Sequence, residues 1–511
     1  MDLTVNGHLD QLVHRSRQPL GIAVGAAVLL CLALGAMLAS PDPTAAVVWV
    51  LAVVFAWAVF RRPLLLYAAT LAQLSIIPAE GHMFGFFVPN MLQFFVPALM
   101  ISIVCDRLRR RSWGLGTLNP VDAAVSLFIL LGYSGILLLP GDRQLKYYTN
   151  QVVFPAMLYF AARWLELDRE KFLWVLRVLL TAAFVMLAIM ALTPLTGRDP
   201  VYYWEAGYKG IGAAARGPIG AVSDTAAYAS LWVPLFLYAA AVPFRHDRTK
   251  RWLAFGGCAL AALAALGTHE RSSVLAVAAG VLFCLVSRDM RRYAIGAMIA
   301  LSLLGMLWVS TRAGATLDQR FREEDPMVRR RLYVQKAVNY IRSSEWDPWL
   351  GTGFARLSEV SLATIPETLY VWDGNWKEWR SARPLAARPI HCAPLTLFGE
   401  YGFMGTACLL AVAGSLLLAG ARINLRARCN GGRTDTALLV AGTACALTVV
   451  ANGLFHNTDT VHQVATMCWA YAGLLVGHPD VFTLKVGRGA AQDEEEAAND
   501  RTGTQRRARA S

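Results

Sequence analysis

Apolar segments of about 20 residues alternate with short polar connections along most of this chain. A helix of about 20 apolar residues spans the ~30 Å hydrocarbon core of a bilayer. The segments that fit this pattern are residues 20–40, 45–60, 63–78, 84–104, 121–140, 150–163, 172–195, 226–244, 252–268, 273–287, 293–311, 393–420, 436–452 and 463–477. The pattern predicts an all-α polytopic membrane protein with about 12–14 transmembrane helices.

Basic residues gather in every second connection between these segments. They lie at residues 15–17, 61–62, 107–111, 163–171, 245–251, 288–292 and 422–433. The positive-inside rule makes these connections cytoplasmic, together with both termini. The remaining connections, such as residues 40–44 and 453–462, then face outward.

One outward connection is long enough to form a domain of its own. The predicted organisation is a cytoplasmic N-terminal tail (1–19), transmembrane helices (20–310), a large, partly helical periplasmic loop (311–392), transmembrane helices (393–477) and a cytoplasmic tail (478–511). The tail carries the acidic run Asp493 to Glu496, which is typical of a disordered, solvated segment. A second outward connection, residues 197–223, is also long enough to hold chemistry.

Composition supports the membrane class and argues against others. The chain is 56% hydrophobic and 16% charged, with a mean hydropathy of +0.42. Its net charge is +13, but the basic residues are distributed between apolar segments rather than gathered on one polar domain, so nucleic acid is not an expected partner. The nine cysteines form no Cys-x-x-Cys pair, which argues against a disulfide framework or a zinc site.

An amphipathic helix is predicted in the large outward loop. Val328, Leu332, Val338 and Ile341 recur at near-helical spacing. The helix should end near Glu345, because Pro348 and a Gly-Thr-Gly turn follow. Three arginines, at 329 to 331, open this helix and suit the capture of a diphosphate, since arginine forms bidentate bonds to phosphate and stays protonated. The alternative is that they contact lipid headgroups or acidic side chains.

Three further residues at outward positions are candidates for chemistry. Arg271 lies at the mouth of a predicted span, where an ionisable group is functional by default, although it could instead snorkel or pair with Glu270. Arg216 lies in the other long outward connection and has weaker support. His391 lies at the end of the large loop, directly before a span, where a neutral imidazole could accept a proton from a hydroxyl. A structural, hydrogen-bonded histidine is the alternative there.

Four stretches of the chain resemble motifs of the O-antigen ligase and polymerase superfamily, polytopic bacterial enzymes that use undecaprenyl diphosphate-linked glycans. They are Arg216-Gly217-Pro218 followed by Ala226 and Ala227; Arg271-Ser272-Ser273; Arg329 to Tyr333 with Ala337, then Pro348 to Gly353; and His391 with Gly402 and Gly405. Glu270 stands where the family has a serine, and Cys392 stands where it favours Asn, Ser or Gln. The order, spacing and common outward side of these motifs carry the resemblance over residues 216–405.

The resemblance implies a metal-independent, inverting glycosyl transfer at the periplasmic face of the bacterial inner membrane, with no cofactor. His391 would be the catalytic base, and the polyprenyl chain of the donor would lie in apolar grooves between spans. The arginines that would bind the diphosphate are Arg216, Arg271, Arg329 and Arg331, of which Arg329 matches best because Tyr333 follows four residues later. The motif glycines would be Gly351, Gly353, Gly402 and Gly405.

Several alternatives stay open at the level of sequence. A ligase would pass the glycan to lipid A-core of lipopolysaccharide, a polymerase to another lipid-linked repeat, and a related enzyme to a protein hydroxyl. Three tryptophans of the large loop, Trp372, Trp376 and Trp379, fit either a sugar-stacking surface or anchors at the membrane interface. A polysaccharide transporter or flippase would need charged residues within spans and an internal repeat, of which Arg177 alone is evident. A membrane scaffold is a further class.

Overall fold

The computed structural model describes residues 60–76, 81–83, 86–88, 92–110, 119–138, 145, 148–165, 167, 169–196, 222–310, 325–373, 378–382, 392–430, 434–454 and 462–477. The first two predicted spans, Arg216, His391 and the C-terminal tail lie outside the described residues.

Each predicted span from residue 63 onward coincides with a helix. These helices are α3 (Pro63–Ile76), α4 (Leu92–Arg109), α5 (Pro120–Leu138), α7 (Phe154–Trp164), α8 (Arg169–Thr196), α9 (Val222–Ala241), α10 (Arg248–Gly267), α11 (Arg271–Cys284), α12 (Arg288–Val309), α17 (Ala393–Asn430), α18 (Thr434–Gly453) and α19 (His462–Gly477). A single π-helical turn, η1 (Thr149–Val153), leads into α7.

Length and composition mark several of these helices as membrane-spanning. In the part of the chain that the structure describes, three are long and apolar enough to cross a bilayer: Glu170–Leu192, Arg288–Leu307 and Ala393–Ser415. Shorter apolar helices are Pro63–Gln73, Pro120–Ser134, Arg271–Cys284 and Ala437–Gly453. The chain is therefore an all-α membrane protein, while the number of spans stays a prediction.

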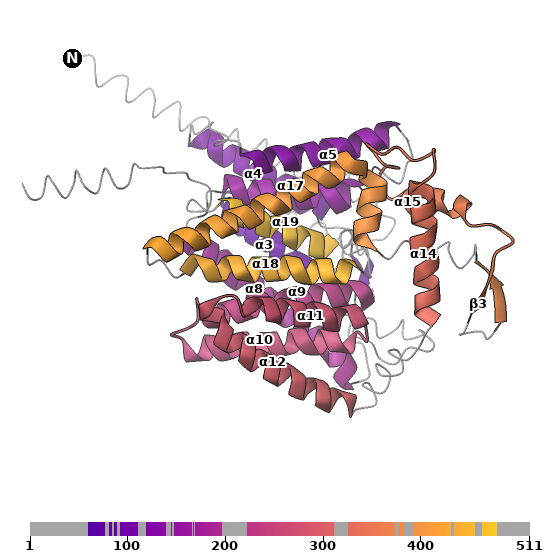
Figure 1. Ribbon diagram of the computed structural model, residues 1–511. Helices are drawn as coiled ribbons and strands as arrows, with labels where there is room; N and C mark the ends of the chain where they lie inside the picture. Colours follow the sequence, from indigo (N-terminus) through magenta and orange to yellow (C-terminus); the bar gives the residue numbers. More distant parts are fainter. Residues whose placement is uncertain are drawn as a thin grey trace, which may run out of the picture.

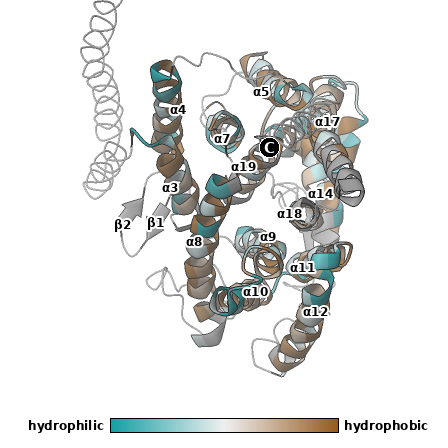
Figure 2. Ribbon diagram, turned by 90° about the vertical axis from the view of Figure 1, so that its left-hand side faces the viewer, coloured by the Kyte–Doolittle hydropathy of each residue, from teal (hydrophilic) through white to brown (hydrophobic). Residues whose placement is uncertain are grey.

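The helices form one bundle, with α9 near its centre (Figure 1). Every described side chain from Thr225 to Ala241 is buried, and α9 packs on α10, α11 and α18. A helix that is buried all round belongs to the interior of a large bundle. The outermost position in Figure 2 belongs to α12, whose predicted span is the least buried of the three.

Two short hairpins depart from the helical prediction. β1 (Gly81–Met83) pairs antiparallel with β2 (Phe86–Val88), and β3 (Tyr370–Asp373) pairs antiparallel with β4 (Glu378–Ser381). The predicted span at 84–104 is therefore wrong at its start, because α4 begins only at Leu92. Pairing between residues 81–83 and 86–88 gives these backbones hydrogen bonds that would otherwise come from a longer helix.

Two of the basic residues between predicted spans join helix ends that are far apart in the sequence. The Arg107 guanidinium donates to the Trp164 carbonyl (3.0 Å), which joins the ends of α4 and α7. The Arg163 guanidinium donates to the Val476 carbonyl at the end of α19 (3.2 Å) and pairs with buried Asp122 at the start of α5 (3.1 Å). The ends of α4, α7 and α19 and the start of α5 therefore lie together, while the sidedness of the whole chain stays a prediction.

The opposite end of the bundle carries the described part of the large loop (Figure 1). Helix α14 (Asp325–Ile341) lies crosswise to the bundle, followed by the short helical turns α15 (Leu357–Val360) and η3 (Ser361–Thr364). The predicted helix exists but ends at Ile341 rather than near Glu345. The Ser343 hydroxyl donates to the Tyr340 carbonyl (2.7 Å), a local bond that competes with continued helix.

Candidate functional site

One face of α14 is buried against the rest of the outward end. Leu332, Tyr333, Lys336, Ala337 and Tyr340 form this face, and they pack on η3, α15 and α17. The motif positions Tyr333 and Ala337 therefore serve packing. Arg331 is exposed on the other side of the helix.

Helix α17 is broken at Gly402, whose backbone is non-helical (φ 59°, ψ −161°). A short half, from Ala393 to Tyr401, meets the long half at a sharp bend visible in Figure 1. A break of this kind leaves amide hydrogens without partners at the start of one half and carbonyls without partners at the end of the other. Those groups need partners from elsewhere in the chain, because leaving them unpaired and buried is costly.

A turn from the large loop caps the start of the long half. The Pro348 carbonyl accepts the Phe403 amide hydrogen (2.8 Å), and the Trp349 carbonyl accepts that of Met404 (3.2 Å). Asp347 shapes this turn, because its Oδ1 accepts the amide hydrogens of Trp349 (2.8 Å) and Leu350 (3.1 Å). The loop thus supplies the acceptors that the broken helix lacks.

The same turn also caps the end of the short half. The Gly399 carbonyl accepts the Thr352 amide (2.9 Å) and the Trp346 indole N–H (3.0 Å). The Glu400 carbonyl accepts the Gly353 amide (3.0 Å). Residues 346–353 and 399–404 therefore form one interlocked unit, which we call the turn–break junction.

The junction explains why glycine is required at its closest contacts. A Cβ built on Gly402 would lie 2.5 Å from the Trp349 carbonyl oxygen, and one built on Gly351 (φ 72°) would lie 2.5 Å from the Glu400 carbonyl oxygen. Both residues also have the positive φ that L side chains rarely adopt. Gly353 shares a positive φ, and a Cβ on Gly405 would lie 2.5 Å from the Cβ of Tyr401 across the break. The four motif glycines thus belong to one backbone feature.

The short half of α17 begins next to the predicted catalytic residue. His391 itself lies outside the described residues, but Cys392 is half-buried against the cluster of Ala337, Tyr340 and Leu357. The Cys392 carbonyl accepts the Thr396 amide hydrogen (2.9 Å), which starts the helix. The chain directly after His391 is therefore fixed against α14 and close to the turn–break junction.

Arg271 begins α11, after a turn of only three residues from α10. The Ser273 hydroxyl donates to the carbonyls of Ala265 (2.9 Å) and Glu270 (2.7 Å), which ties the turn to both helices. Glu270, which replaces the family's serine, is the extended residue before α11. The half-buried Arg271 lies at the same end of the bundle as α14 (Figure 1).

The structure also brings buried polar residues to this end to which the sequence analysis gave no role. His269, two residues before Arg271, is 2% exposed and has φ 55°, a left-handed backbone. Lys336 is fully buried on α14, and its ammonium donates to the Ser358 carbonyl (3.0 Å). The sequence around Lys336 is that of an ordinary amphipathic helix, so the hydrophobic pattern gave no signal that this lysine is buried. His269 lies in a short connection between two predicted spans, and an ionisable residue at such a position is a signal that could have been used.

We expect stability to depend on pH through Lys336. Burial lowers the pKa of its ammonium from 10.5 to about 8. Between these values the unfolded chain binds the proton and the folded one does not, so the free energy of unfolding should rise with pH from 8 to 10.5 and gain nothing below 8. Thermal unfolding of the detergent-solubilised protein at pH 7 to 10 measures this. Lys336→Met should flatten the rise, and an identical slope in both proteins would contradict the assignment.

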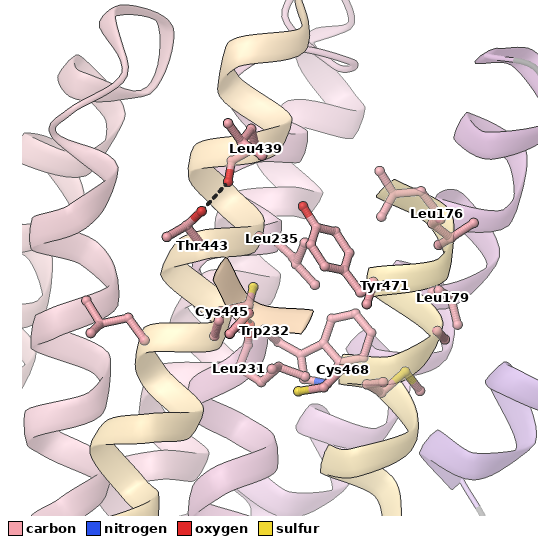
Figure 3. Close-up of a pocket in the computed structure, with 18 of the residues that line it drawn as sticks. Leu176, Leu179, Leu231, Trp232, Leu235, Leu439, Thr443, Cys445, Cys468 and Tyr471 are labelled. Atoms are coloured by element: carbon pink, nitrogen blue, oxygen red, sulfur yellow. Dashed lines mark hydrogen bonds between the residues drawn. The ribbon is translucent and has the colours of Figure 1, made fainter. Parts of the chain in front are cut away.

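An apolar cavity of about 350 Å³ lies within the bundle, among α8, α9, α17, α18 and α19 (Figure 3). The side chains labelled around it are mostly leucines, with Trp232, Cys445, Cys468 and Tyr471. The Tyr471 hydroxyl donates a hydrogen bond to the Leu438 carbonyl (2.7 Å), and the Thr443 hydroxyl donates one to the Leu439 carbonyl (3.0 Å). Neither hydroxyl hydrogen is therefore left for a ligand. Such a lining suits a hydrocarbon rather than a polar ligand.

Comparison with known families gives one match. Residues 256–410 match the profile described as O-antigen ligase. The matched region runs from α10 to α17, and it contains Arg271, Arg329, Arg331, His391 and all four motif glycines, whereas Arg216 precedes it. The comparison with curated proteins gave no match.

The matched family has a general type of activity. It is a family of ligase- or polymerase-type glycosyltransferases in bacterial multi-pass membrane proteins, whose substrates are lipid-linked glycans and their acceptors. The resemblance found in the sequence motifs is thereby confirmed. Residues 256–410 of this chain are therefore similar to the O-antigen ligase family, both in their motifs and over their whole length.

Proposed function

We propose that this protein is an O-antigen ligase-like glycosyltransferase that moves a glycan from undecaprenyl diphosphate to an acceptor hydroxyl at the periplasmic face of the inner membrane. The observation that carries the proposal is the turn–break junction within the matched region, next to the residue that follows His391. A rigid backbone unit at one mouth of a membrane bundle suits a site that must hold its reacting groups in fixed positions.

His391 is the general base in this proposal. It accepts the proton of the acceptor hydroxyl as the oxygen attacks the anomeric carbon from the side opposite the diphosphate. The bond from that carbon to the diphosphate oxygen breaks, and undecaprenyl diphosphate leaves as an anion. The configuration at the anomeric carbon is inverted, and the leaving group needs no general acid because a diphosphate is already a weak base.

Arginines hold the diphosphate and offset the charge that develops on it. Arg271 lies in the first turn of α11, at the end of that helix that is predicted to face outward, which suits this role. Arg329 precedes Tyr333 by four residues, the spacing that carries the family resemblance, whereas Arg331 is exposed. We therefore favour Arg329 over Arg331 as the second contact. Arg216 stays a further candidate, and fixed positive charge of this kind can act without a metal ion.

The apolar cavity among α8, α9 and α19 is a candidate for part of the polyprenyl chain. Its near-complete lack of available polar groups is what a hydrocarbon requires. The donor could then react without leaving the membrane.

Two tryptophans of the large loop are candidates for contact with the acceptor. The β3–β4 hairpin places Trp372 directly opposite Trp379, which keeps both the sugar-stacking and the interface roles open. Trp376 lies outside the described residues.

The proposal is tested by gel electrophoresis of surface glycan from a deletion strain with and without the wild-type gene. We expect the deletion strain to accumulate lipid-linked polymer and the gene to restore long chains on lipid A-core. Single repeats on lipid A-core in the deletion strain would instead identify a polymerase of the same superfamily. Failure to detect any lipid-linked glycan on the periplasmic side in the deletion strain would favour a transporter or flippase. An unchanged glycan pattern would favour a scaffold.

We expect Arg271→Gln to lower transfer about 10²-fold, because it removes a charged donor aimed at the leaving group. Arg271→Lys should recover part of this loss, since it restores the charge without the bidentate geometry. The rate of release of undecaprenyl diphosphate by the purified protein measures both. Arg245→Gln, at the opposite end of the bundle, is the matched control and should stay within about twofold of wild type. Equal activity of Arg271→Gln and Arg245→Gln would remove Arg271 from the site.

A further inference from the structure

The long half of α17 presents a continuous apolar face that no other described element covers. Phe403, Met404, Leu410 and Leu418 are 53%, 39%, 67% and 61% exposed, and their spacing places them on one side of the helix. An exposed apolar face on a helix of a membrane protein fits acyl chains.

The length of this apolar face indicates how deep each of its residues lies in the bilayer. Arg422, the first arginine of the basic segment at residues 422–433, lies within α17, 19 positions after Phe403. At 1.5 Å per residue this is about 28 Å, close to the ~30 Å thickness of the hydrocarbon core. If Arg422 marks the inner boundary, Phe403 lies at the outer boundary.

Trp349 extends the same face beyond the start of the long half. It is 64% exposed, its ring centroid lies 6.2 Å from that of Phe403, and its carbonyl accepts the Met404 amide hydrogen. Behind it, Phe398 packs on Phe403 (5.0 Å) and Trp346 packs on Phe398 (5.1 Å). Exposed aromatic side chains thus mark the end of the apolar face, where an interfacial belt is expected.

We propose that Trp349 and Phe403 bind the lipid of the outer leaflet at the boundary between headgroups and acyl chains, and thereby hold the turn–break junction at the membrane surface. Tryptophan suits this position because its ring is largely apolar while its N–H can reach water or headgroups. A sugar-stacking platform would also use exposed tryptophan, but it would not continue into an apolar face that runs along a spanning helix. The lipid contact holds whichever transfer or transport activity the protein has, so it does not depend on the proposed function.

Fluorescence quenching in vesicles tests this contact. Wild type and Trp349→Phe are reconstituted in phosphatidylcholine brominated at carbons 6 and 7 or at carbons 11 and 12, and the difference in emission between the two proteins reports Trp349 alone. We expect the 6,7-dibromo lipid to quench this difference at least twofold more than the 11,12-dibromo lipid, and aqueous iodide to quench it less than either. Trp349→Tyr gives the same readout if phenylalanine disturbs the packing.

Two results would overturn the proposal. Quenching by iodide but by neither brominated lipid would place Trp349 in water, as a sugar-binding role requires. Quenching by the 11,12-dibromo lipid that equals or exceeds that by the 6,7-dibromo lipid would place it below the boundary, within the hydrocarbon. Trp232→Phe is the matched control, because Trp232 is 1% exposed within the bundle and iodide should not reach it.

Discussion

Replacement of His391 by alanine is expected to reduce glycan transfer by about 10²–10⁴-fold, the contribution typical of a positioned general base. Binding of the donor should change little, because the arginines and the polyprenyl chain are untouched. The reaction with purified protein should show this as a fall in kcat with a nearly constant KM for the lipid-linked donor. A fall confined to KM would assign His391 to binding instead.

Two further observations separate a base from a structural histidine. The wild-type rate should rise with pH as the imidazole loses its proton, since only the neutral ring accepts one, and this rise should vanish in His391→Ala. Cys392→Ser is the matched control, because Cys392 is the next residue, it packs against α14, and serine is close to cysteine in size. We expect that variant to keep most of the wild-type rate and the same pH dependence. Equal loss in both variants would indicate that the segment matters only for folding.

Gly402→Ala should have the largest effect on the structure. A non-glycine residue at φ 59° and ψ −161° is strained by about 1–3 kcal/mol, and the added Cβ would also lie 2.5 Å from the Trp349 carbonyl oxygen. The turn must then move away, which breaks the caps on Phe403 and Met404. Together these costs predict a loss of at least about 3 kcal/mol in the free energy of unfolding.

Gly414→Ala is the matched control for this prediction. Gly414 lies on the same helix, and a Cβ added there would meet nothing within 4 Å. The melting temperature in detergent should fall strongly for Gly402→Ala. It should not fall for Gly414→Ala, because alanine is a better helix former than glycine. Similar behaviour of the two variants would show that the junction does not constrain the fold.

Hydropathy predicted the helices well because burial in lipid or in a bundle demands long apolar runs. Helices α8, α9 and α18, for example, lie within a few residues of the predicted spans. The β1–β2 hairpin was missed because Phe86, Phe87 and Val88 extend an apolar run that cannot by itself be told from a helix. The β3–β4 hairpin did carry a signal, since Asp373-Gly374 between aromatic residues is typical of a tight turn.

The motif glycines could be identified from the sequence, but the backbone arrangement that joins them could not. Gly402 was identified as a motif residue, yet residues 393–420 read as one uninterrupted span, because hydropathy contains no information on backbone breaks. The break becomes stable only through partners about 50 residues earlier in the chain, the carbonyls of Pro348 and Trp349. Burial of Lys336 likewise depends on α15 and η3, which local sequence patterns do not reveal.

The most direct test of the proposed activity uses purified protein in vesicles with an undecaprenyl diphosphate-linked glycan, either lipid A-core or a second lipid-linked repeat as acceptor, and EDTA. Our account predicts a new glycosidic bond with inverted anomeric configuration, one undecaprenyl diphosphate released per bond, and a rate that EDTA does not lower. Retained configuration, loss of the reaction in EDTA, or movement of the glycan across the vesicle without bond formation would contradict it.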